Sequence, residues 1–505
     1  MNKETINNWK DKAITRMKLL KSTKKELKRQ KERADKWRVE ALVLREQIRN
    51  KDLIINKLDS VSGSLISDSA ITPTTERLKL KGYKYDIKLI SLCINLYKCG
   101  LSLRSICSVL CFMGIYLGVK IKIPSYGIIS VWVQKSGLHL LKTGAERFKN
   151  TAEQWSLIID ESYTLGKSRL LVILAVRLSK LQVGRLKTTD VVPIVIKSQE
   201  SWKSEDVTIC INQAVLQFKG NIAYVTSDQG TNLVCSCKAT NLAHLPDWSH
   251  TAANILENIY TKEPDFKEFN EKIGIFKRKR KQSIYTHYSP PNLSVKVRFM
   301  NYLPFLEWAN IMIKNFKKIP IEIVPELMFL QTLKTSIQEM SELFYMADTI
   351  GKILKTEGIS KITRTKVTTK IETLTKKYPN NQRVATFIDR INDYFTQTMP
   401  IYYDYIKRQD KDAPFFNGLV ASSDVIECIF GKVKHRAPKN PKIGFSSSSL
   451  LIPLFCQDFS NEDIFDAMNN INCETLELWK TENICSRKYI SFKNIFKQKK
   501  GKVCN

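Results

Sequence analysis

The segment from 155 to 227 most constrains the fold of this 505-residue chain. Three stretches, 155–162, 169–178 and 191–199, are rich in β-branched residues and have the length of strands. A helical stretch at 203–220 and a fourth strand at 222–227 follow. Three consecutive strands, a helix and another strand predict a mixed β-sheet covered by helices, so we expect an α/β domain within a multidomain chain.

Charge is the second constraint. The chain carries 81 Lys and Arg against 49 Asp and Glu, a formal net charge of +32 at pH 7. This excess favours a polyanionic partner, and nucleic acid fits better than a membrane because no apolar run approaches the roughly 20 residues that span a bilayer. The amino terminus lacks the apolar core of a signal peptide, and the 12 cysteines are scattered without metal-ligand spacing. We therefore expect a cytoplasmic protein with reduced thiols and no membrane partner.

Residues 1–60 contain no Gly or Pro and are dense in Lys, Arg and Glu, which is typical of a long solvated helix. Apolar residues recur every seven positions, which predicts a coiled coil that dimerises the chain, although the companion row three residues later is incomplete. A helix folded back on its own chain is the alternative. The segment 61–79 is expected to be a linker. The heptad residues are Ile6, Ala13, Leu20, Leu27, Ala34, Ala41, Ile48 and Ile55.

Short amphipathic helices are expected between 80 and 148. One helix breaks at Gly100, a second begins after the good capping residue Ser102, and a third follows Pro124. A helix, a tight turn and a second helix carrying Arg104 fit a helix-turn-helix domain that lays its second helix in the major groove. A helical bundle without DNA contact is the alternative, and the net charge favours the DNA-binding interpretation.

The remaining chain alternates between α/β and all-α composition. We expect residues 149–260 to form the first part of the α/β core and residues 261–415 to form a mainly α-helical insertion. Residues 416–450 are expected to return to the core with one further helix. Residues 451–505 form a C-terminal region with a basic tail.

Three carboxylates occupy positions at which the fold can bring them together. Asp160 ends the first strand in "LIIDES", Asp228 follows the fourth in "YVTSDQG", and Glu427 lies in "SDVIECIFGK" on a helix that Asp424 or Ser423 can cap. Clustered carboxylates repel one another, and two Mg²⁺ ions about 3.5–4 Å apart would relieve the repulsion and support phosphoryl transfer. Asp424 is the alternative ligand to Glu427.

The order and context of these acids resemble the RNase H-like catalytic core of DDE transposases and retroviral-type integrases. A helical insertion between the second Asp and the Glu is similar to that of bacterial insertion-sequence transposases. The resemblance covers about residues 150–450 in fold. Its local matches are "SDQGTN", "SDVIECIFGKVK" and the segment 290–309, "PPNLSVKVRFMNYLPFLEWA".

The resemblance implies a function. Asp160, Asp228 and Glu427 would bind two Mg²⁺ ions, with Mn²⁺ as a substitute, in a DDE transposase that nicks the ends of a mobile element and joins the freed 3′-hydroxyl to target DNA. The partners would be double-stranded DNA, as terminal repeats and target, and a second copy of the chain in a homodimer or higher oligomer. The location would be a bacterial cytoplasm, on the nucleoid when DNA is bound. A catalytically inactive transposase-derived DNA-binding protein and a coiled-coil scaffold are the competing functions.

Other residues are candidates for supporting the site or contacting DNA. Asp247 and His250 match a pair in related transposases, and they either position DNA or serve as a helix cap and a half-buried histidine. The basic run 277–281 is expected on a surface loop that contacts the phosphate backbone, and the basic residues after Glu427 are expected to bind the strand in the site. The candidate DNA-binding residues are Arg104, Lys277, Arg278, Lys279, Arg280, Lys281, Lys432, Lys434 and Arg436.

Overall fold

The structure is a computed structural model of the chain, which divides into two compact units, Met1–Arg77 and Leu78–Asn505. The expected coiled coil 1–60, apart from the helical residue Met17, the expected linker 61–79 and the basic tail from 486 onward lie outside the described residues. The structure describes Met17 and residues 82–146, 154–163, 168–178, 186–218, 221–292, 299, 302–409, 417–436 and 447–485.

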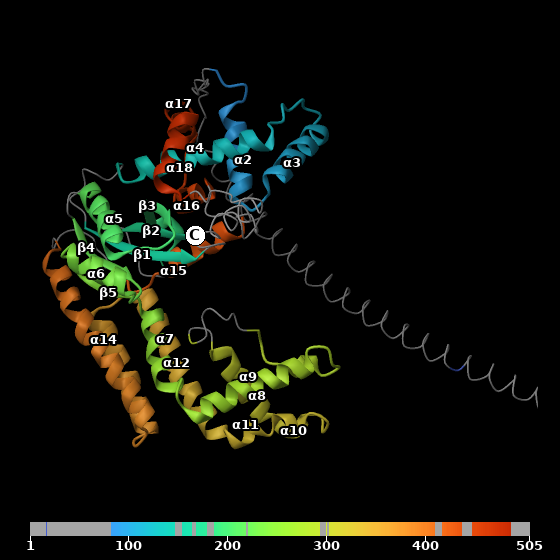
Figure 1. Cartoon of the computed structure of the whole chain (residues 1–505), viewed down its shortest axis with the longest axis vertical. Coiled ribbons are helices and arrows are strands. Elements are labelled where there is room, and N and C mark those ends of the chain that lie inside the picture. Colours follow the sequence, from blue (N-terminus) through green and yellow to red (C-terminus); the bar gives the residue numbers. More distant parts are fainter. Residues whose placement is uncertain are drawn as a thin grey trace, which may run out of the picture. The chain divides into compact units, whose positions relative to one another are not determined.

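A mixed five-stranded sheet forms the centre of the second unit (Figure 1). Its strand order is β3-β2-β1-β4-β5, with β1 antiparallel to β2, β2 antiparallel to β3, and β1–β4 and β4–β5 parallel. This order is consistent with an RNase H-like fold. The four predicted strands are confirmed, whereas the three-residue β5 was not predicted. The strands are β1 Trp155–Tyr163, β2 Arg169–Arg177, β3 Val191–Gln199, β4 Ile222–Ser227 and β5 His244–Pro246.

The two faces of the sheet pack against different helices, because successive side chains of a strand point to opposite faces. Leu157 and Ile159 of β1 share one apolar cluster with residues of α5, Ser204–Gln217, and α6, Thr231–Ala239. Ile158 belongs to the other cluster, together with residues of three helices: α4, Tyr126–Gly144, α15, Asp424–Lys434, and α16, Leu451–Cys456. Asp160 lies two residues beyond Ile158, so it is on the face that α15 covers.

Three helices within the described residues 82–146 precede the sheet: α2 Ile87–Lys98, α3 Leu103–Tyr116 and α4 Tyr126–Gly144. The predicted break at Gly100 is confirmed, because its φ of +116° lies in the region that favours glycine. Ser102 caps α3 by accepting a hydrogen bond from the Ser105 N–H, as expected. The helix α4 packs on α2, α3 and strand β3, and also on the C-terminal helices α16 Leu451–Cys456, α17 Asn461–Asn470 and α18 Cys473–Asn483.

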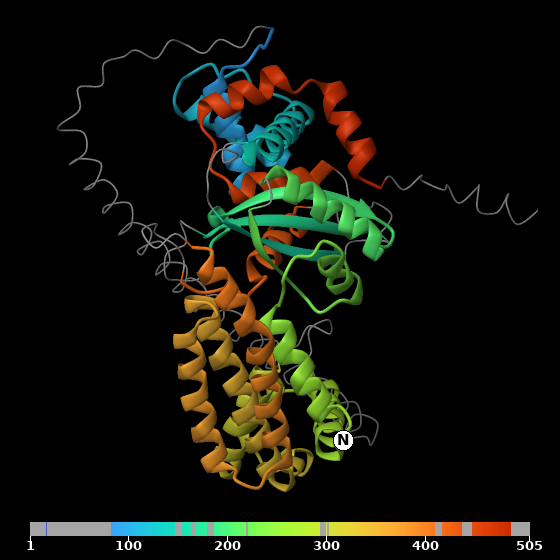
Figure 2. The same cartoon turned by 90° about the vertical axis from the view of Figure 1, so that its left-hand side faces the viewer.

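The predicted all-α region is confirmed. Figure 2 shows its yellow to orange helices packed side by side below the sheet, where α12 and α14 both contact α7. None of the helices in the described ranges is long and apolar enough to cross a membrane. The helices are α7 Trp248–Tyr260, α8 Pro264–Arg280, α9 Leu303–Lys314, α10 Val324–Leu327, α11 Phe329–Thr332, α12 Lys334–Glu357, α13 Lys361–Lys377, α14 Gln382–Lys407 and α15 Asp424–Lys434; short 3-10 turns are Thr188–Asp190, Thr286–Tyr288, Phe316–Lys318 and Ser447–Leu450.

Candidate active site

Two of the predicted acids lie at one edge of the sheet because their strands are parallel neighbours. Ile158 of β1 pairs with Thr226 of β4, and Asp160 and Asp228 each follow two residues later. Asp160 lies inside β1 and does not end it as expected, because antiparallel pairing with β2 continues the strand to Tyr163. The carboxyl ends of adjacent parallel strands face the same way, so the two acids still lie at the same edge of the sheet. This is the arrangement that the sequence predicted for the first two members of the cluster.

The loop after β4 is shaped by its own side chains. The Gly230 N–H donates to Asp228 Oδ1 at 2.9 Å, and a Cβ at Gly230 would lie 3.0 Å from that oxygen, so a larger residue would crowd the carboxylate. Gln229 donates to Thr251 Oγ1 of α7 at 3.1 Å. Asn232 donates to the carboxylate of Glu161, the residue after Asp160. One carboxylate oxygen of Asp228, Oδ1, is therefore hydrogen-bonded within the loop.

The segment that precedes α15 is hydrogen-bonded to β4 and α7. Thr226 Oγ1 donates to the Val420 carbonyl at 2.7 Å, and the Val420 N–H donates to the Tyr224 hydroxyl at 2.8 Å. The Trp248 N–H donates to the Ala421 carbonyl at 3.0 Å. These contacts join segments far apart in the chain, with 194 positions between Thr226 and Val420, and they hold the start of α15 near the sheet edge.

Asp247 fixes the start of α15 to the start of α7. Its side chain is 0% exposed, and Oδ1 caps α7 by accepting from the His250 N–H at 2.9 Å. Oδ2 accepts from both the N–H of Ser423, at 2.6 Å, and its hydroxyl, at 3.0 Å. Burial raises the pKa of Asp247, and the hydrogen bonds from His250 and Ser423 oppose that shift. Of the two roles that the sequence left open, the structure gives Asp247 the cap, together with a contact that the sequence did not predict.

Glu427 of α15 and His250 of α7 lie next to each other beside the two aspartates. His250 Nε2 lies 3.6 Å from Glu427 Oε1, and both side chains are partly exposed. The Glu427 side chain raises the pKa of His250 to about 9, against the lowering effect of burial, with smaller contributions from Asp247, Asp228 and Asp160. His250 is therefore a cation at neutral pH beside the carboxylates.

Asp160 has the strongest electrostatic signature of the three acids. Loss of solvent and the negative charges of Asp228 and Glu427 raise its pKa to about 7, while His250 opposes the shift. Among the side chains that the structure describes, no three His, Cys, Asp or Glu residues are close enough together to hold a metal ion as they stand. The acids thus influence one another without forming a closed set of ligands.

Asp424, the alternative to Glu427, points to a different partner. Its Oδ2 lies 2.6 Å from Lys355 Nζ of α12, an ion pair that the sequence did not predict. Glu427 is one helical turn further along α15, and its charge acts on Asp160 and His250. The geometry therefore favours Glu427 as the third acid. The N-cap position of α15 is Ser423, whose side chain bonds to Asp247 instead of capping the helix.

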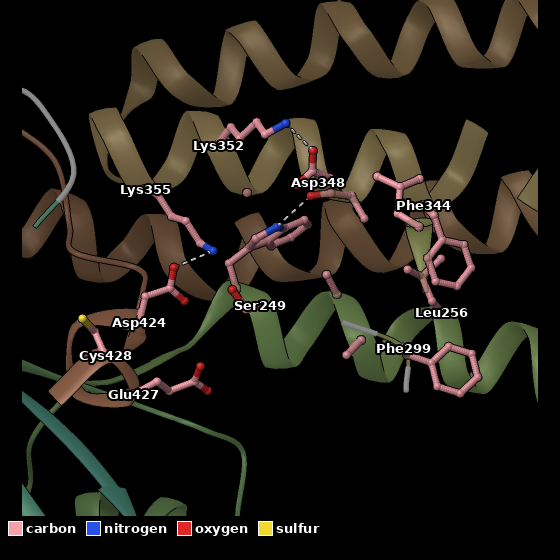
Figure 3. Close-up of a pocket in the computed structure, with 16 residues that line it drawn as sticks. Ser249, Leu256, Phe299, Phe344, Asp348, Lys352, Lys355, Asp424, Glu427 and Cys428 are labelled. Carbon is pink, nitrogen blue, oxygen red and sulfur yellow. Dashed lines mark hydrogen bonds and ion pairs between the residues drawn. The ribbon is translucent and has the colours of Figure 1, made fainter. Parts of the chain in front are cut away.

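A cavity of about 530 Å³ opens beside Glu427, between α7, α12 and α15 (Figure 3). Lys355 reaches across it to Asp424, and Lys352 pairs with Asp348 of the same helix at 2.7 Å. Phe299 and Phe344 line the far end in Figure 3. The cavity thus combines charged groups near Glu427 with an apolar end.

The basic run 277–281 is at the end of helix α8, so the expectation of a surface loop was wrong. Helix continues here because Lys and Arg are good helix formers, and basic residues in a last turn suit the helix dipole. Arg280 donates to Glu326 at 2.9 Å, and Lys279 also lies near Glu326, at 3.6 Å. Lys277 donates to the Pro291 carbonyl at 3.2 Å. Contact of this run with DNA stays a prediction.

Other predicted DNA-binding residues contact aromatic rings. Arg104 lies over Tyr126, at 5.2 Å from the ring centroid, and Lys432 over Phe455, at 5.6 Å. Lys434 lies over Phe430, at 5.8 Å. These contacts leave their DNA-binding roles untested.

Arg436 makes the firmest intramolecular contacts of this group. It donates to the Lys98 carbonyl at 2.7 Å, and its guanidinium lies 5.7 Å from the Tyr97 ring centroid and 4.8 Å from that of Phe455. It joins the end of α15 to the end of α2, a role that the sequence did not predict.

No known protein family matches this sequence, and no curated protein does. The topology of the sheet and the geometry of the acidic edge are therefore the grounds for a functional proposal.

Proposed function

We propose that the chain is a DDE-type transposase that cleaves DNA at the ends of a mobile element and transfers the freed end to target DNA. One observation carries the proposal: Asp160, from β1, lies at the same sheet edge as Asp228, from the loop after β4, and loss of solvent together with the charges of Asp228 and of Glu427, from α15, raises its pKa to about 7. Carboxylates that lie close together in spite of their mutual repulsion are typical of a functional site, and these lie at the edge of a sheet with RNase H-like strand order. The net charge of +32 supports DNA as the substrate.

The donor set suits divalent cations. Three carboxylates offer only oxygen, which Mg²⁺ and Mn²⁺ prefer, and the raised pKa of Asp160 indicates that positive charge would be stabilised there. Asp160, Asp228 and Glu427 would hold the ions, whose chemistry is to polarise the scissile phosphate and stabilise charge on the attacking and leaving oxygens.

The surrounding residues orient these acids. Gly230 holds one oxygen of Asp228 by its N–H, and Asn232 holds the carboxylate of Glu161. The cationic His250 faces the site from α7, where it would attract a DNA phosphate. Self-association through residues 1–60 and end recognition through α2–α4 belong to the same proposal.

Cleavage assays test the proposal. With Mg²⁺ or Mn²⁺, the full chain should nick duplex oligonucleotides that carry the DNA flanking its gene, and Asp228→Asn should remove the activity. Asp466→Asn, an exposed carboxylate of α17, is the matched control and should nick like the original chain. Equal activity of the original chain and Asp228→Asn would exclude Asp228 from catalysis. DNA binding without nicking by the original chain would favour the inactive DNA-binding alternative.

Cation binding should also appear as thermal stabilisation. At a Ca²⁺ or Mg²⁺ concentration about 100 times the dissociation constant, the ions should add about 2.7 kcal/mol to the free energy of unfolding, seen as a higher Tm in scanning fluorimetry. Asp160→Asn should lose this shift because it removes a ligand. Without cations the same variant should melt no lower than the original chain, because it also removes carboxylate repulsion. A full cation shift in Asp160→Asn would contradict the assigned ligands.

A further inference from the structure

Strand transfer, the step of the proposed function on which this inference rests, places a geometric demand on the site. In an in-line displacement the attacking and leaving oxygens lie on opposite sides of the phosphorus. Two DNA segments must therefore approach the acidic edge from different directions. The surface around α7 has two hollows that could each hold one of these DNA segments.

The helix α7 separates these hollows. The cavity of Figure 3, on one side, is lined by Glu427. A second hollow, of about 590 Å³, lies between α7, α14 and the β4–α6 loop, and it is lined by Gln229, the residue after Asp228. Each hollow thus reaches the edge next to a different member of the proposed triad.

The second hollow, which we call the amide groove, is lined by side chains of the types that hydrogen-bond to base edges. Asn254 and Asn258 line it one turn apart on α7, and Arg390 and Gln397 line it from α14. All four are exposed. In the part of the chain that the structure describes, the side chains of Asn254, Asn258 and Gln397 make no hydrogen bond, and Arg390 has a loose, exposed pairing with Asp393 at 3.7 Å.

The chemistry of the two hollows differs. The cavity of Figure 3 presents lysines already paired with carboxylates, and lysine contacts a phosphate as a point charge. The amide groove presents Asn, Gln and Arg, which form paired hydrogen bonds with adenine and guanine edges. Its wall is held in place near the active site, because Gln229 is hydrogen-bonded to Thr251 of α7.

We propose that the amide groove binds the DNA bases adjoining the scissile phosphate and sets the base preference of cleavage. Asn254 and Asn258 hydrogen-bond to base edges, with Arg390 and Gln397 on the facing wall. Loss of one such paired contact weakens base discrimination by about tenfold. The groove is distinct from the helices α2–α4, which the proposed function assigns to binding the terminal repeats at a distance from the cut.

The probe for this inference is a library of duplex oligonucleotides with randomised bases around one central position, nicked by the full chain with Mn²⁺ and sequenced. The original chain should show a base preference next to the nick. Asn254→Ala combined with Asn258→Ala should reduce that base preference by about tenfold or more. Total nicking should fall by a smaller factor than the preference. Glu257→Gln, an exposed residue of α7 that does not line the groove, is the matched control and should keep the preference.

The outcomes separate this inference from the proposed function. Nicking no greater than that of Asp228→Asn would overturn both. Nicking without any base preference, or a preference unchanged in the double variant, would overturn the role of the groove and leave the nuclease standing. If the double variant does not fold, Gln397→Ala on the facing wall provides the same test.

Discussion

Replacing Glu427 by Gln should lower the rate of Mg²⁺-dependent DNA cleavage by about 10³-fold, the order expected when one group that stabilises developing charge is lost. Asp424→Asn, three residues earlier on the same helix, should stay within about fivefold of the original rate, a loss of about 1 kcal/mol, because Asp424 pairs with Lys355 of α12 and is not among the charges that act on Asp160. The measurement is single-turnover cleavage of a duplex oligonucleotide by each variant.

The comparison is informative because both residues lie in the first turn of α15 and both line the cavity of Figure 3. A general disturbance of the helix would slow both variants to a similar degree. A larger loss of cleavage rate in Asp424→Asn than in Glu427→Gln would make Asp424 the third ligand. The assignments of Asp160 and Asp228 would not change.

The sheet could be predicted from sequence because its strands are buried on both faces. Continuous apolar runs of strand length, such as 169–177, are typical of strands that are buried on both faces. The three-residue strand β5 could not be predicted, because its pairing with β4 depends on a backbone alignment and not on local composition. Its location matters, since it places Asp247 next to the end of β4.

The acidic edge was predictable for a related reason. Asp160 and Asp228 each interrupt an apolar run at its end, and parallel pairing of β1 with β4 brings such ends together. The partner of Asp424 was not predictable, because Lys355 lies on α12, far away in sequence with no local signal. The same holds for Arg436, whose position among basic residues suggested DNA and not Tyr97 or Phe455.

Asp247→Asn should loosen α15 without removing the cap of α7. An asparagine oxygen can still accept from the His250 N–H, but its NH₂ group would face the N–H and hydroxyl of Ser423, so the buried acceptor is lost. The Ser423 hydroxyl can turn and accept from the NH₂ group, but leaving the buried Ser423 N–H without an acceptor costs about 1–3 kcal/mol. Hydrogen exchange of the first amides of α15 should become about 10–100 times faster, since each 1.4 kcal/mol is a factor of ten.

Cleavage should fall with the same substitution, because Glu427 is held at the sheet edge through that contact with Ser423. Ser423→Ala, which removes only the hydroxyl and keeps the N–H bond to Asp247, is the matched control and should cost about 1 kcal/mol or less. Its cleavage rate should lie between those of the original chain and Asp247→Asn. Normal exchange at α15 combined with a large loss of cleavage in Asp247→Asn would show that Asp247 acts on the DNA and not through the position of Glu427.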